Sequence, residues 1–130
     1  MASIKNQLLK SFIKINVLEN LPGMLKIHIR DLNNIKKEIR IYDQYVIVAI
    51  ELLKGIQDVT IDYQKNTITI LYDKDIVRPQ LIYKWLHIII DVAIDNLDFI
   101  KKYSKQNILF VEEKLTKLLQ NKLTALQAKE

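Results

Sequence analysis

The stretch GIQDVTIDYQKNTITILYD, residues 55–73, limits the folds open to this chain more than any other part of it. Apolar and polar residues alternate both before and after a short polar run. This is the pattern of two half-buried strands joined by a turn. The turn contains Gln64, Lys65 and Asn66, and Asn is the one of these residues that best tolerates a positive φ angle. We therefore predict a β-hairpin whose apolar face is formed by Val59, Ile61, Tyr63, Ile68, Ile70 and Tyr72.

A strand and a helix are predicted before this hairpin. Residues 24–32, MLKIHIRDL, alternate between apolar and polar side chains and follow a chain break at Leu21-Pro22-Gly23. After a charged loop, Asp43 can cap a helix that Gly55 ends. The apolar stripe of this helix consists of Val46, Ile47, Ile50 and Leu53, widened by Ala49.

A long apolar helix is predicted after the hairpin. It starts at Asp75 or Pro79, runs to Tyr103 and is apolar over most of its circumference, so it must be covered on more than one side. Its polar stripe excludes a membrane span, because charged side chains recur within the one segment that is long enough to cross a bilayer. This stripe consists of Lys84, His87, Asp91, Asp95, Asp98 and Lys102.

Both ends of the chain carry helical patterns. Residues 3–18 place Ile4, Leu8, Phe12 and Ile15 on one side and predict an amphipathic helix, although FIKINV also alternates like a strand. From Asn107 onward, leucines at helical spacing predict a third helix, with the alternative that residues 107–111, NILFV, form a last strand. These leucines are Leu115, Leu118, Leu119, Leu123 and Leu126.

The order strand, helix, hairpin, helix predicts the fold class. It is the order of an α+β, ferredoxin-like βαββα antiparallel sheet in which two helices cover one face and a fourth strand can follow. We expect residues 1–20 to be an amphipathic N-terminal helix, residues 21–103 to form the ferredoxin-like domain, and residues 104–130 to be a C-terminal helical extension.

Composition narrows the functional classes. The chain of 130 residues has no cysteine, which excludes disulfides, thiolate metal sites and cysteine nucleophiles. No nucleophile–base pair and no glycine-rich phosphate loop is visible in the sequence, so we expect neither enzymatic activity nor a cofactor. Lysines interrupt the apolar residues at the N-terminus too often for a secretory signal, and we expect a cytoplasmic protein.

Two stretches resemble a known family. LPGMLKIHI, and LLKGIQDVTIDYQKNTITILYD after the first predicted helix of the domain, resemble the heavy-metal-associated (HMA) domain over about residues 21–90. The Leu-Pro-Gly opening is similar to the cysteine-free variant at the N-termini of some P-type metal-transporting ATPases and in stand-alone proteins of metal and iron handling. The resemblance implies a non-enzymatic accessory protein of bacterial metal homeostasis that contacts such an ATPase.

The loop after the first strand of the domain departs from the metal chaperones of this family. Those chaperones hold copper or zinc between two cysteines at this place, whereas the loop here is DLNNIKKE and has no thiol. A soft cation prefers thiolate ligands. Transfer of such a cation through this loop is therefore not expected.

Two sets of candidate site residues stand out. His87, Asp91 and Asp95 lie one turn apart on one helix face and could share Fe²⁺, Mn²⁺ or Zn²⁺; alternatively they are the solvated face of a buried helix. The second set would contact a protein partner or a second copy of the chain. It consists of Leu8, Phe12, Trp85, Leu115, Leu119 and Leu123.

Two other functional classes remain. Lysines beside the apolar face of the N-terminal helix suit a protein that is peripheral to an anionic membrane, or a scaffold that uses the terminal helices as anchors. The net charge of +5 raises the alternative of a nucleic-acid-binding regulator. Nucleic acid is the less favoured partner, because Lys26, His28 and Arg30 have no aromatic residue between them on which bases could stack.

Overall fold

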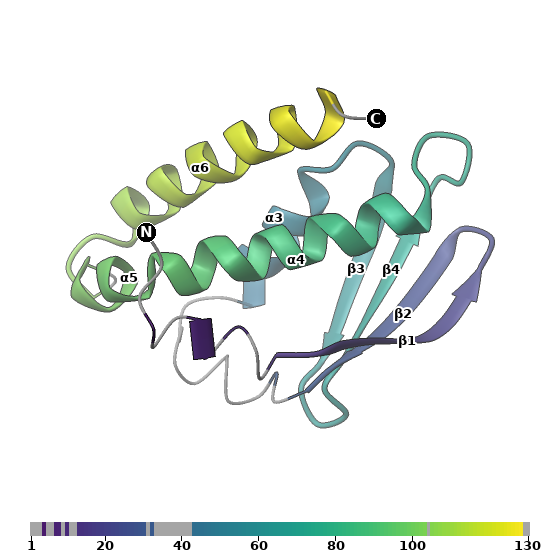
Figure 1. Ribbon diagram of the computed structural model, residues 1–130, viewed down its shortest axis with the longest axis horizontal. Coiled ribbons are helices and arrows are strands. Elements are labelled where there is room, and N and C mark those ends of the chain that lie inside the picture. Colours follow the sequence, from purple (N-terminus) through teal and green to yellow (C-terminus); the bar gives the residue numbers. More distant parts are fainter. Residues whose placement is uncertain are drawn as a thin grey trace.

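The structure is a computed structural model that describes residues 4, 7, 8, 10, 13–30, 32, 43–103 and 105–128 (Figure 1). The fold is α+β and contains a four-stranded antiparallel sheet. Its elements, in chain order, are β1 (Ile15–Leu21), β2 (Met24–Ile29), α3 (Asp43–Glu51), β3 (Ile56–Asp62), β4 (Thr67–Tyr72), α4 (Pro79–Asp95), α5 (Leu97–Tyr103) and α6 (Ile108–Ala128).

The predicted hairpin is confirmed as β3 and β4. Asn66 has a φ of +55° in the turn. The Asp62 carboxylate accepts hydrogen bonds from the amides of Gln64 at 3.0 Å and Lys65 at 3.2 Å, which closes the turn locally. The strand order across the sheet is β1-β2-β4-β3, so β4 lies between β2 and β3.

The helix expected over residues 3–18 is wrong from Ile13 onward. The described residues 4, 7, 8 and 10 are helical, but Ile15–Leu21 form β1 and pair with β2, with Leu21 opposite Met24. Pro22 fixes a negative φ and Gly23 takes +82°, the combination of a type II turn. β1 is an edge strand, and its backbone groups that face β2 are satisfied by this pairing, so the alternation prevails over the helical spacing. The expected domain boundary after residue 20 therefore cuts through a strand.

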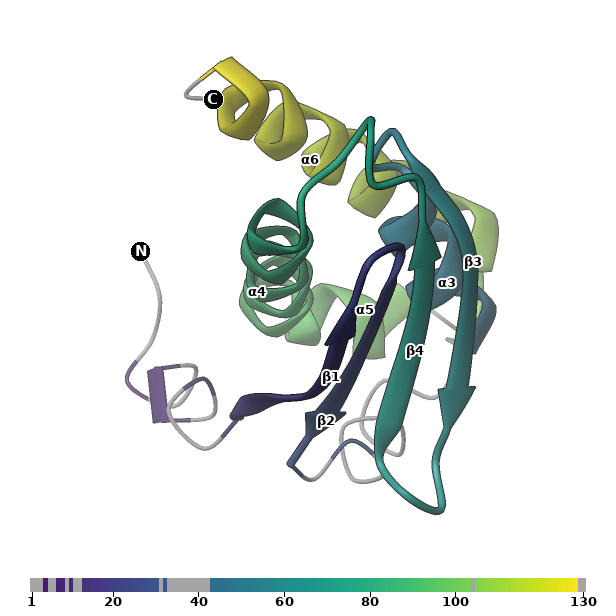
Figure 2. The same ribbon diagram turned by 90° about the vertical axis from the view of Figure 1, so that its right-hand side faces the viewer.

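One face of the sheet is buried. The helices lie together on that side (Figure 2). Trp85 of α4 is fully buried among them, and its indole N–H donates to the carbonyl oxygen of Ala49 at 2.9 Å, which ties α4 to α3. The sheet residues that point into this core include Leu25, Ile27, Ile29, Val59, Ile68 and Ile70.

The helix expected to run to Tyr103 is interrupted. It begins at Pro79 as predicted, but α4 ends at Asp95, and Asn96 departs from helical geometry with φ −111° and ψ 17°. The Asn96 side-chain amide donates to the carbonyl oxygen of Val92 at 2.8 Å. The backbone amide of Asn96 also donates to this carbonyl oxygen, at 3.1 Å, and α5 follows as a separate segment.

The tail is helical and belongs to the same core. Of the two interpretations of residues 107–111, the helix is confirmed: α6 begins at Ile108, and the Asn107 side chain accepts from the amide of Phe110 at 3.1 Å as an N-cap. Figure 1 shows α6 lying along α4. Its buried leucines join the same hydrophobic cluster as the sheet, so α6 covers the second side that the apolar α4 needs.

None of the helices formed by the described residues is both long enough and apolar enough to cross a membrane.

Candidate functional site

The predicted metal ligands do not come together. His87, Asp91 and Asp95 are exposed along one face of α4. The Asp95 carboxylate pairs with the Lys10 ammonium at 2.8 Å, and the His87 ring lies against that of Tyr83 with centroids 4.7 Å apart. Among the residues that the structure describes, no group of three or more His, Cys, Asp or Glu is placed to hold a metal ion. A single helical row points its side chains into solvent instead of around an ion, so this row is the solvated face of α4.

Most of the predicted contact residues are inside the protein. Trp85, Leu115, Leu119 and Leu123 are buried within the core of the single chain, so they are not placed to contact a partner as predicted. The apolar sides of α4 and α6 cover each other, which removes this reason to expect a second copy of the chain. Leu8 is 55% exposed. Phe12 lies outside the described residues.

The face of the sheet opposite the helices is polar along most of its length. Lys26 and His28 lie on this face, as predicted, and are half-buried. Two rows of paired residues cross the strands there, and none of their members is Phe, Tyr or Trp. The rows are Asn16, His28, Thr67 and Asp62, and then Glu19, Lys26, Thr69 and Thr60.

The third row of this face combines three apolar residues with the exposed Asp58 of β3, which pairs with Leu71. Leu21 pairs with Met24, and Met24 with Leu71. The loop after β4 adds Ile76 at the same end of the sheet, where the amide of Tyr72 also donates to the carbonyl oxygen of Gly23 at 3.0 Å. Leu21 is 53%, Leu71 40% and Ile76 52% exposed. We call Leu21, Met24, Leu71 and Ile76 the apolar end.

Sequence reasoning missed the apolar end, although one signal was present. The side chains of β4 on the uncovered face are Thr67, Thr69 and Leu71. A large apolar residue therefore shares this face with two polar ones. A leucine at such a position indicates an exposed apolar side chain once the hairpin is assigned.

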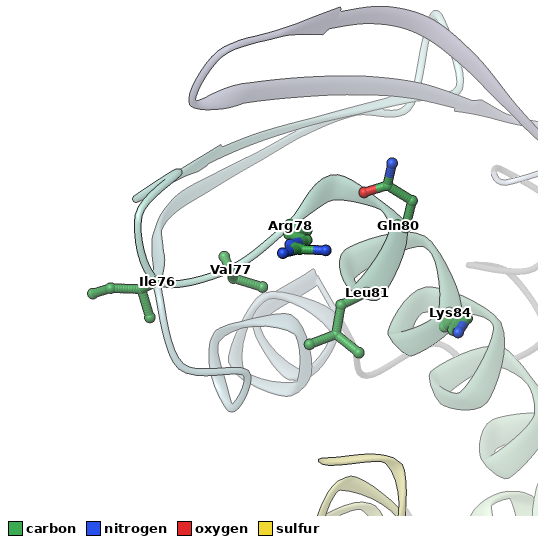
Figure 3. A pocket seen from close by; sticks show the side chains of 6 residues that line it. All are labelled: Ile76, Val77, Arg78, Gln80, Leu81 and Lys84. Atoms are coloured by element: carbon green, nitrogen blue, oxygen red, sulfur yellow. The ribbon is translucent and has the colours of Figure 1, made fainter. Parts of the chain in front are cut away.

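An open cleft of about 600 Å³ adjoins the apolar end at the start of α4 (Figure 3). Its described lining combines an apolar base with two cationic side chains, and it contains no acidic residue. The lining residues are Ile76, Val77, Arg78, Gln80, Leu81 and Lys84. The cleft therefore favours an acidic or amphipathic segment over a basic one.

The backbone at the N-terminus of α4 contributes little to anion binding in this cleft. Arg78 is the N-cap and its side chain makes no capping hydrogen bond. The amides of Leu81 and Ile82 both donate to the carbonyl oxygen of Arg78, at 3.1 and 3.3 Å, and Pro79 has no N–H. Attraction for an anionic group thus comes from the side chains of Arg78 and Lys84. The described lining has no carboxylate, hydroxyl or imidazole.

No protein-family model, curated protein or solved structure matches this chain, so no relative assigns a role to the apolar end or to the cleft.

Proposed function

We propose that this protein is a non-enzymatic interaction protein of bacterial metal homeostasis that acts by contact with a P-type metal-transporting ATPase. Support comes from the resemblance of LPGMLKIHI and GIQDVTIDYQKNTITILYD to the cysteine-free HMA domain. The proposal includes a ferredoxin-like core, β2-α3-β3-β4-α4. What favours it is that β4 lies antiparallel between β2 and β3, which is how a split βαβ unit with an inserted hairpin strand is arranged. In this proposal β1 occupies the edge next to β2.

The observation that carries the proposal is the apolar end beside the cationic cleft. Leu21, Leu71 and Ile76 are each about half exposed at one end of the protein, and grouped exposed apolar side chains mark interaction sites. Arg78 and Lys84 lie next to them in the cleft. An apolar centre with a charged rim is the usual composition of a protein–protein contact. The partner surface is accordingly apolar, with acidic residues where it faces Arg78 and Lys84.

The metal in this proposal is the cargo of the ATPase and is not carried by this chain. The sequence has no thiol, and the loop DLNNIKKE offers no other soft ligand. Soft cations select thiolate ligands, so handing a copper ion from this loop to a transporter is disfavoured. The role left to the protein is regulation or assembly of the transporter through contact.

The test is binding of the full chain to purified cytosolic domains of the P-type metal-transporting ATPases encoded in the same genome, measured by calorimetry. Leu71→Asp places a charge in the apolar end without entering the core, and we expect it to weaken binding at least tenfold, as loss of about 1.4 kcal/mol would. Leu109→Asp changes a leucine on α6 that is 67% exposed; it is the control and should bind normally. Absence of binding by the unaltered protein, or equal losses in both variants, would overturn the proposal.

A second candidate is a role at an anionic membrane surface. The described part of the N-terminal segment exposes Ile4 by 78% and Leu8 by 55%, and Lys10 lies within one turn of Leu8. Apolar side chains beside a lysine are the composition of a helix that binds in the membrane interface.

A further inference from the structure

A cavity of about 70 Å³ lies between the sheet, α3 and α4. Ile29 of β2 and Ile68 of β4 form its floor, and Ile50 of α3 forms one wall. Leu86 and Ile89 of α4 form the opposite wall. Every described residue that lines the cavity is aliphatic, and all five of these are buried. The described lining therefore offers water no hydrogen-bond partner.

The cavity has a mouth, because some of its lining residues are partly exposed. These are Ile13, Val46, Ile90 and Ala93. Ala93 has the smallest side chain of the four, so the mouth is least obstructed there. A charged pair lies beside this mouth: the Ile13 amide donates to the carbonyl oxygen of Lys10 at 3.3 Å, and the Lys10 ammonium bonds the Asp95 carboxylate at 2.8 Å.

We propose that this cavity binds the end of an aliphatic chain. An aliphatic ligand gains contacts there that water cannot make, and an engineered apolar cavity of ~150 Å³ in another protein takes up benzene or xenon. At about half that volume, this cavity is too small for an aromatic ring and accommodates the last carbons of a chain. The remainder of the ligand leaves past Ala93 towards Lys10, where its head group meets water and the ion pair.

The experiment uses the full chain with ¹³C-labelled isoleucine methyl groups, titrated with 1-hexanol and, separately, with hexanoate. We expect saturable shifts at the methyl groups of Ile50, Ile68 and Ile89, and none at Ile76, which is exposed at the far end of the sheet. Ala93→Leu should fill the mouth and weaken binding at least tenfold. Ala125→Leu, the same substitution at an exposed position on α6, should leave binding unchanged.

Comparison of the two probes shows whether the head group of the ligand contributes to binding. Equal binding of both probes supports recognition of the chain alone, and tighter, salt-sensitive binding of hexanoate supports a carboxylate head group beside Lys10. The proposal is overturned if neither probe gives a saturable shift at these three residues, or if the shifts persist in Ala93→Leu. Circular dichroism first confirms that this variant is folded. If it is not, Ala93→Val, with its smaller added volume, is held to the same result.

Discussion

At the scale of single residues, we expect substitution of Trp85 to lower the stability of the protein. Its indole is fully buried and donates to the Ala49 carbonyl oxygen at 2.9 Å. We expect Trp85→Phe to lower the free energy of unfolding by about 1–3 kcal/mol, because a buried carbonyl group loses its donor and the smaller ring leaves a void. Urea denaturation followed by circular dichroism measures this.

The matched control is Tyr83→Phe. The Tyr83 hydroxyl donates to the carbonyl oxygen of Ile15 at 3.1 Å in a half-buried place, where water can replace it. A loss of stability in this control as large as in Trp85→Phe would contradict the account of the buried bond.

Gly55 is the position where backbone geometry matters most. Its φ is +102°, and an added Cβ would lie 2.8 Å from a methyl carbon of Val77. Gly55→Ala should therefore destabilise the protein by about 1–3 kcal/mol through strain, and by more if Val77 cannot move. Asn66→Gly, at a φ of +55°, needs no strained geometry and should have little effect. Similar melting temperatures for the two variants would refute this reasoning.

At the scale of elements, the sequence predicted those segments in which the apolar residues follow one periodicity, either alternating or helical. The hairpin and α4 could be recognised because alternation or helical spacing in each admits one interpretation. The apolar residues of Ile15–Leu21 fit both the helical and the alternating spacing in part. This segment is a strand because it pairs with β2, which follows it after the Pro22–Gly23 turn. No local signal states which partner is available. The same limit explains why leucines of α6 were predicted to contact a partner. Their stripe is visible in the sequence, but the helix of the same chain that covers it is not.

The N-terminal segment gives a prediction for the membrane alternative. If this segment binds a membrane, the protein should float with anionic liposomes, less so at high salt, and Leu8→Asp should abolish flotation, because apolar insertion and lysine attraction act together. Val48→Asp, which changes an exposed aliphatic residue on α3, is the control. An unaltered protein that stays with the soluble fraction removes this alternative.

The packing of α6 gives a second prediction at this scale. Leu119 is buried, whereas Leu109 on the same helix is exposed. Leu119→Ala should lower the free energy of unfolding by about 2–5 kcal/mol, and Leu109→Ala by under about 0.5 kcal/mol. Thermal unfolding of both variants tests whether α6 is part of the core. Equal stability of the two would mean that α6 does not pack as described.

At the scale of the whole molecule, we expect the protein not to carry soft metal ions. The chain has no cysteine, and the described residues hold no cluster of three potential ligands. We expect Cu⁺ and Zn²⁺ to bind no better than they do to a general protein surface. Stoichiometric, tight binding in calorimetry that survives the double substitution His28→Ala and His87→Ala would contradict this.

The position of α6 over α4 also has a consequence for biosynthesis. Chains are made from the N-terminus at about 5–20 residues per second, and domains complete their core when the last contributing element appears. Here the strands and α4 leave the ribosome before α6, yet α4 is apolar on the side that α6 covers. Until α6 has emerged from the ribosome, the nascent protein exposes that apolar side, where chaperones can bind and other nascent chains can misassemble.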